Sequence, residues 1–149
     1  MLASPYLQKM YSGNWKEAAD RDRDGLLSWR VGDLFDPEAF IDVMNVIHGR
    51  NRLVPRTVDL ELLAKIAVIT DYLKCHESME IFSALWMVSL EDSLPETYSR
   101  DLVLWIMISS IFRNKVVFRS ATRTAILRSG EEVPCVGIPI HEDIIREFP

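Results

Sequence analysis

Residues 36–50 read Asp-Pro-Glu-Ala-Phe-Ile-Asp-Val-Met-Asn-Val-Ile-His-Gly-Arg, which predicts one helix with a signal at each end. Asp36 can accept hydrogen bonds from the free amides of the first turn, and Pro37 suits the first helical position because no donor is lost there. Glu38 adds negative charge near the positive helix start, and Gly49 permits a left-handed exit. An apolar stripe follows at helical spacing: Phe40, Val43, Met44 and Ile47.

Two further segments, one on each side of this helix, complete a recognisable series. Residues 36–50 match a phrase whose common form is S-P-E-A-F…Y-x-G. Residues 2–17, Leu-Ala-Ser-Pro-Tyr-Leu-Gln-Lys-Met-Tyr-Ser-Gly-Asn-Trp-Lys-Glu, look like L-x-x-S-P-Y-F-x-x-M-x-x-G-x-x-K-E. Residues 60–77 look like the L-A-x-x-A-D-x-Y-x-C helix pair. Because these three matches occur in this order, the chain resembles the BTB/POZ domain. Its sequence motifs look most like those of BTB proteins from filamentous fungi.

The resemblance also predicts that the domain is partial. A full domain of this family begins with two strands and a helix that carry an F-x-V-H-K-x-V-L phrase, whereas this chain opens at the tail of that phrase, at Leu2. Those pieces form much of the family's dimer interface and one edge of its small sheet. We therefore expect the fold to be inherited only in part, and dimerisation is left open.

Length and composition suit one packed domain. The 149 residues, 48% of them hydrophobic, are enough for a core that buries roughly 70% of the unfolded surface. A net charge of -5 argues against nonspecific nucleic-acid binding, which depends on clustered Lys and Arg. The apolar run at residues 102–112 is too short to cross a membrane, because a span needs roughly 20 residues. No export signal is apparent, and Cys75 and Cys135 have no metal-type spacing, so an intracellular protein, cytoplasmic or nuclear, is expected.

Periodicity predicts a mostly helical (α+β) chain with a very small sheet. The first helix is expected at 5–11, after a Ser4 cap and before Gly13, and another is expected from 58, with Thr57 or Asp59 as its cap. After a polar break at 74–78, a helix is expected at 79–90, and the next at 102–112 after a Ser99 cap. Two more are expected, one at 115–128 and one near the end around Ile144, Ile145 and Phe148. A strand is expected at 26–31, an extended segment at 133–138, and a short edge strand or extended connection at Leu53-Val54, limited by Pro55. Pro95 divides a partial BTB/POZ-like domain, 1–94, from a helical extension packed on it, 95–149.

The loop Asp20-Arg21-Asp22-Arg23-Asp24-Gly25 opens like a calcium-binding loop, in which alternate carboxylates converge on the ion. The twelfth position, where a bidentate acid is expected, is Val31, and the nearest acid, Asp33, comes two residues late. The interleaved arginines also offset the negative charge that a cation needs. A solvated, salt-bridged loop is therefore favoured over a calcium site, and no metal is expected.

The remaining reactive side chains do not form a catalytic pattern. His48 precedes the helix-ending glycine and is expected to cap carbonyls, while His141 has no evident partner. Cys75 and His76 are adjacent, so their side chains should diverge on a helix, and Cys75 is expected to pack as a small apolar group. No nucleophile elbow, phosphate-binding loop or zinc motif occurs. We therefore expect neither a catalytic residue nor a cofactor.

The resemblance implies a protein–protein interaction module, a non-catalytic scaffold or adaptor. Members of the family self-associate, and whether this chain also forms a homodimer or higher oligomer is left open because its part of that interface is missing. The alternative is a substrate adaptor of a cullin-type ubiquitin ligase, with the extension acting like the helical box of such adaptors. An alternative of another class is a calcium-binding domain through residues 20–25. Trp86 and Trp105 fall on apolar stripes and should be core. Trp is also common at binding hot spots, so the candidate contacts with partner proteins are Leu34, Phe35, Asp36, Tyr98, Arg100, Trp15 and Trp29.

Overall fold

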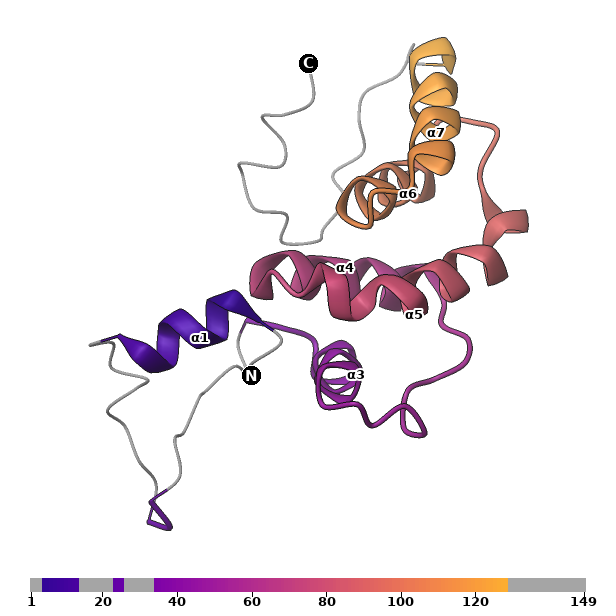
Figure 1. Cartoon of the computed structure of the whole chain (residues 1–149). Helices are drawn as coiled ribbons and strands as arrows, with labels where there is room; N and C mark the ends of the chain where they lie inside the picture. Colours follow the sequence, from indigo (N-terminus) through magenta and orange to yellow (C-terminus); the bar gives the residue numbers. More distant parts are fainter. Residues whose placement is uncertain (1–3, 14–22, 26–33, 129–149) are drawn as a thin grey trace.

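The computed structural model describes residues 4–13, 23–25 and 34–128, and it shows helices gathered around one central helix (Figure 1). In chain order the elements are α1 (Pro5–Ser12), α3 (Pro37–Ile47), α4 (Leu60–Leu73), α5 (His76–Ser89), the short 3-10 helix η1 (Glu91–Ser93), α6 (Arg100–Ile111) and α7 (Lys115–Arg128). Within those described ranges there is no strand. The prediction of a mostly helical chain is confirmed. The strand predicted at 26–31, the extended segment at 133–138 and the closing helix lie outside the described residues.

Most helices begin where a side chain can accept a hydrogen bond from the first turn. Ser4 accepts from the Leu7 amide, Asp59 from the Leu62 amide and Ser99 from the Leu102 amide. Asp36 accepts from both the Glu38 and Ala39 amides at 3.1 Å. Gly49 has a φ of 67°, which is the predicted left-handed exit from α3. The predicted caps Ser4, Asp36, Asp59 and Ser99 are confirmed, and α7 has the predicted bounds. Two starts differ from the prediction, since α4 begins at Leu60 rather than at 58 and α6 begins at Arg100 rather than at 102.

Two other local predictions are also wrong. Helix α5 begins at His76 rather than after Ser78, because the Cys75 carbonyl already accepts from the Met79 amide and residues 76–78 form the first turn. The break after α4 is therefore only Lys74 and Cys75. Leu53-Val54 is not a strand, since Leu53 ends a turn in which its amide donates to the Arg50 carbonyl and Val54 follows in a bend.

Helix α4 is the centre of the fold and packs against α1, α3, α5 and α6, while α7 packs on α6 (Figure 1). Its fully buried apolar side chains extend around most of the helix: Leu63, Ala64, Ile66, Ala67, Ile69 and Leu73. One continuous core runs from Leu7 in α1 to Ala121 in α7. The segment after Pro95 thus shares the core of the segment before it, and a domain boundary at that proline stays a prediction.

The buried faces of α3 and α5 differ in part from those that the spacing predicted. In α3, Val43 is fully buried, whereas Phe40, Met44 and Ile47 are only half-buried. In α5, Met79 and Trp86 are fully buried as expected, but Leu85 is 45% exposed. The inner face of α5 instead uses Ser83 and Met87, because a helix packed closely on two neighbours needs small and flexible side chains at the contact.

Both tryptophans predicted to be core are fully buried. The Trp86 Nε1–H donates to the Pro55 carbonyl at 2.9 Å, which ties α5 to the segment before α4. The Trp105 Nε1–H, in α6, is buried with no hydrogen-bond partner in the described part of the chain. Trp15 and Trp29 lie outside the described residues. None of the helices in the described ranges has the length and apolar character that crossing a membrane requires.

Candidate interaction surface

A row of half-exposed residues runs along one side of α4 and contacts the start of α3 and the start of α6. We call this row the α4 strip: Glu61, Lys65, Val68 and Tyr72. Their spacing of four, three and four residues places them in one line along a helix. Because α4 is central, this line is where side chains from three other helices can meet at the surface.

Lys65 of the α4 strip holds the start of α3. Its Nζ lies 2.8 Å from Oδ2 of Asp36, while Oδ1 of the same carboxylate caps α3. The hydrogen bond from Lys65, together with the one from the Ala39 amide, lowers the pKa of Asp36 below its usual value. The same contact raises the pKa of Lys65. Both side chains are partly exposed, so the ion pair contributes at most about 1 kcal/mol, and its main effect is positional.

Glu61, one turn earlier, holds the start of α6. Its two carboxylate oxygens accept from the Nη2 of Arg100, one of them at 3.1 Å. This contact raises the pKa of Arg100 further above its already high value. A guanidinium shared by both oxygens of one carboxylate has a more restricted geometry than a single contact. Arg100 is the first residue of α6, so the contact ties the start of that helix to α4.

Aromatic side chains surround Tyr72 at the other end of the α4 strip. The Phe35 ring meets Tyr72 edge-on with centroids 5.1 Å apart, and it stacks on Phe40 at 6.0 Å. The Tyr6 ring lies 4.9 Å from Tyr72, and the two hydroxyl oxygens are 2.8 Å apart. Such pairs add about 0.5–1.5 kcal/mol each beyond the area that they bury. They fix α1 and the segment before α3 on α4.

The structure places five of the seven predicted contact residues. Leu34 is 54% exposed, Phe35 and Tyr98 are half-buried against the core, and Asp36 and Arg100 meet the α4 strip. Asp36 and Arg100 come from different helices, yet α4 brings them to one surface through Lys65 and Glu61. The sequence analysis did not identify Glu61, Lys65 or Tyr72 as residues of this surface. The spacing of Glu61 and Lys65 was the available signal, but it suggests a pair within α4 rather than contacts with α3 and α6.

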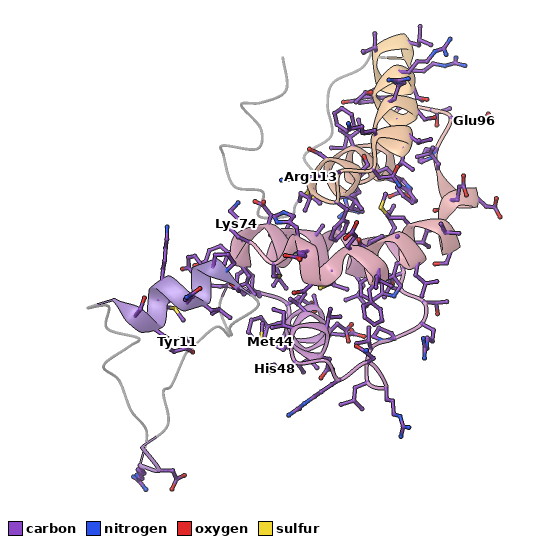
Figure 2. The ribbon with its side chains drawn as sticks, viewed as in Figure 1. Tyr11, Met44, His48, Lys74, Glu96 and Arg113 are labelled. Carbon is purple, nitrogen blue, oxygen red and sulfur yellow. The ribbon has the colours of Figure 1, made fainter. Side chains whose placement is uncertain are left out.

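A pocket of about 330 Å³ lies between the start of α5 and the end of α6, lined by His76, Glu77, Glu80, Ser83, Ile111, Phe112 and Arg113. Arg113 follows α6 and Lys74 follows α4, and both are labelled in Figure 2. Each has a left-handed φ, 56° and 52° respectively. The Lys74 turn joins α4 to α5 and the Arg113 turn joins α6 to α7, and of the two residues only Arg113 lines the pocket.

The titratable groups next to this pocket are not arranged as a nucleophile and a base. Cys75 is buried, as predicted, and burial raises the pKa of its thiol to about 12. Its Sγ lies 3.8 Å from the Thr70 carbonyl oxygen. Burial lowers the pKa of His76, against the opposing effect of Asp71, whose Oδ1 lies 3.4 Å from Nε2. The thiol is therefore protonated and the imidazole neutral at pH 7.

The remaining side chains considered in the sequence are His48, the predicted calcium loop, Cys135 and His141. His48 is exposed at the end of α3, and its backbone amide donates to the Met44 carbonyl. Residues 20–22 of the predicted calcium loop, together with Cys135 and His141, lie outside the described residues. Within the described ranges, no three His, Cys, Asp or Glu side chains gather as metal ligands would.

No protein-family model, curated protein or solved structure matches this chain.

Proposed function

We propose that the chain is a protein–protein interaction module of BTB/POZ type, a non-catalytic scaffold or adaptor that acts in the cytoplasm or nucleus. The sequence resemblance supports this, since the three resembling segments include α1, α3, and α4 with the start of α5. The proposed fold combines this helical cluster with a very small sheet. The proposed partners are other proteins.

The observation that carries the proposal is the attachment of residues 34–36 and Arg100 to α4. Ion pairs from Asp36 and Arg100 and the aromatic contacts of Phe35 hold these segments in place, while Leu34 stays largely exposed. A surface that is ordered before binding loses less entropy when a partner arrives. An exposed apolar side chain beside fixed aromatic rings suits an anchor at the centre of a contact.

A narrower form of the proposal is a substrate adaptor that binds the amino-terminal domain of a cullin through this surface. It is tested by titrating a purified cullin amino-terminal domain into the intact gene product and measuring heat. The proposal predicts saturable binding, weakened at least about tenfold by Leu34→Asp, since a charge would be buried at the contact. Leu53→Asp is the matched control, because Leu53 is also exposed but follows the opposite end of α3.

The outcomes separate the two forms. Equal loss from both variants would contradict a contact centred on Leu34. No binding by the unaltered protein would refute the cullin adaptor. Two results together would refute the broader interaction module. The protein would have to stay monomeric, and the Leu34→Asp variant would have to crosslink in cells to the same proteins as the unaltered chain.

A further inference from the structure

The outward face of α5 is apolar in its centre and acidic at its start. We call the exposed residues Glu77, Glu80, Ile81, Ala84, Leu85 and Val88 the α5 face; Glu77 and Glu80 lie at its edge, where they also line the pocket beside α6. Ile81 is 80% exposed and Val88 is 68% exposed. Helix α5 contains no Lys or Arg, and the acids Glu91 and Asp92 follow in η1. Contiguous apolar surface exposed on one side of a helix is a feature of sites that contact another molecule.

The outward face of α7 has the opposite charge. We call Lys115, Val116, Arg119, Arg123, Ile126 and Leu127 the α7 face, and all six are exposed. Helix α7 contains no Asp or Glu. Its first half is hollowed by a groove of about 380 Å³, lined by Lys115, Val116, Arg119, Ser120 and Arg123. Among the ion pairs within the described ranges, none involves a charged residue of either face.

The two faces match each other in length, charge and order. Both helices have 14 residues, so each is about 21 Å long. When the helices are aligned in parallel, Glu77 and Glu80 come opposite Lys115 and Arg119. The same alignment places Leu85 and Val88 opposite Ile126 and Leu127, and Ile81 opposite the groove. Both the charged halves and the apolar halves are then complementary.

We propose that the α5 face of one copy of this chain docks on the α7 face of a second copy, with Ile81 seated in the groove of α7. This inference rests on the proposed interaction function and names a partner for it, on a surface other than that around Leu34. If the contact is reciprocal, α5 on α7 and α7 on α5, it closes a dimer. A contact made only head to tail would instead give a series of larger species.

The test is a charge exchange followed by sedimentation equilibrium of the full chain. The Glu77→Lys/Glu80→Lys variant makes both faces basic, and the Lys115→Glu/Arg119→Glu variant makes both acidic. Each variant alone should associate at least about tenfold more weakly than the unaltered chain. An equimolar mixture of the two should recover association, since the α5 face of each then has the opposite charge to the α7 face of the other. A folding defect cannot produce this recovery.

Three further measurements complete the test. Arg52→Glu/Arg56→Glu, a double reversal at exposed residues outside both faces, should leave the mass unchanged. Ile81→Ala should weaken association, whereas Ile41→Ala, at an exposed isoleucine of α3, should not. Raising the salt from 50 to 500 mM, about a threefold change in screening length, should also weaken it. A monomer at all concentrations, or a mixture that stays monomeric, would overturn the inference while leaving the Leu34 surface untouched.

Discussion

Asp36 and Lys65 form a contact in which one carboxylate serves two helices. Oδ1 of Asp36 accepts from the first turn of α3, and Oδ2 lies 2.8 Å from the Lys65 Nζ in α4. The start of α3 is thus capped and positioned by the same side chain. A residue with two such contacts should show two separable energetic effects, which substitutions at Asp36 and Lys65 can divide.

We expect Asp36→Ala to lower the free energy of unfolding by about 1–2 kcal/mol, because the cap is lost. Asp36→Asn, which keeps a capping oxygen, and Lys65→Met should each cost less than about 1 kcal/mol. Urea denaturation of the three variants measures this. Since the pKa of Asp36 is lowered in the folded chain, its contribution is present above the unfolded value and is lost as the pH falls through the folded pKa. Equal losses for Asp36→Ala and Asp36→Asn would contradict the capping role.

Lys74→Gly is expected to stabilise the protein by about 0.5–1 kcal/mol. Lys74 has a φ of 52°, a conformation that costs a residue with a Cβ about 1–2 kcal/mol and that glycine adopts freely. The substitution also removes the ion pair of Lys74 with Asp71. Because this pair lies at the surface, its loss should cost less free energy than the relief of the backbone conformation provides. Thermal unfolding measures the effect. Lys9→Gly, within α1, is the control and should destabilise by about 1 kcal/mol.

The Cys75 thiol should resist modification in the folded protein. Its pKa is about 12, so almost none of it is thiolate at pH 8, and it is 1% exposed. In a Cys135→Ser background, Ellman's reagent should react with Cys75 only after denaturant is added. Rapid reaction of the native variant would show that the packing of α4 against α5 opens readily.

Asp42→Asn should raise the melting temperature at pH 7. Burial, with a smaller effect of Glu38, raises the pKa of Asp42, so its charged form opposes folding at neutral pH. As the pH falls through the folded pKa, the native carboxyl takes up a proton before the unfolded one, and the penalty disappears. The gain should therefore shrink in acid. The repulsion from Glu38, four residues earlier in α3, accounts for up to about 0.5 kcal/mol of this gain. Asp92→Asn, at an exposed residue of η1, is the control and should have no comparable effect.

Trp86→Phe should destabilise the protein by about 1 kcal/mol more than Trp105→Phe. Both substitutions remove the same volume from a fully buried site, but only Trp86 loses a hydrogen bond, and the Pro55 carbonyl is left without it. The Trp105 Nε1–H has no described partner to lose. Chemical denaturation of the two variants gives the comparison, and equal costs would mean that the Trp86 bond contributes little.

The sequence was informative wherever structure depends on neighbouring residues. Ser4, Asp36, Asp59 and Gly49 act as predicted because capping is decided within one turn of the chain. The choice of buried face was less predictable. Helix α5 has apolar residues on opposite sides, and only its packing on α3 and α4 decides that Trp86 turns inward and Leu85 outward.

The candidate surface shows the same limit. The family resemblance points to Leu34, Phe35, Asp36 and Arg100 as candidate contacts, and this stays a prediction. The resemblance does not point to the residues of α4 that hold Asp36 and Arg100 in place. Glu61 and Lys65 have a spacing that suits a pair within one helix, and their actual partners lie 39 and 29 residues away. Such distant pairing depends on how α3 and α6 cross α4, which no local pattern of charges contains.

The central position of α4 has a consequence for hydrogen exchange. The amides of its buried residues, such as Ile66 and Ile69, are enclosed by the neighbouring helices, so they can meet deuterated solvent only when the whole cluster comes apart. The amides of α7, which lies at the margin on α6, need only a local detachment. Protection factors should therefore fall from the middle of the molecule outward, and those of Ile66 and Ile69 should report its global stability directly.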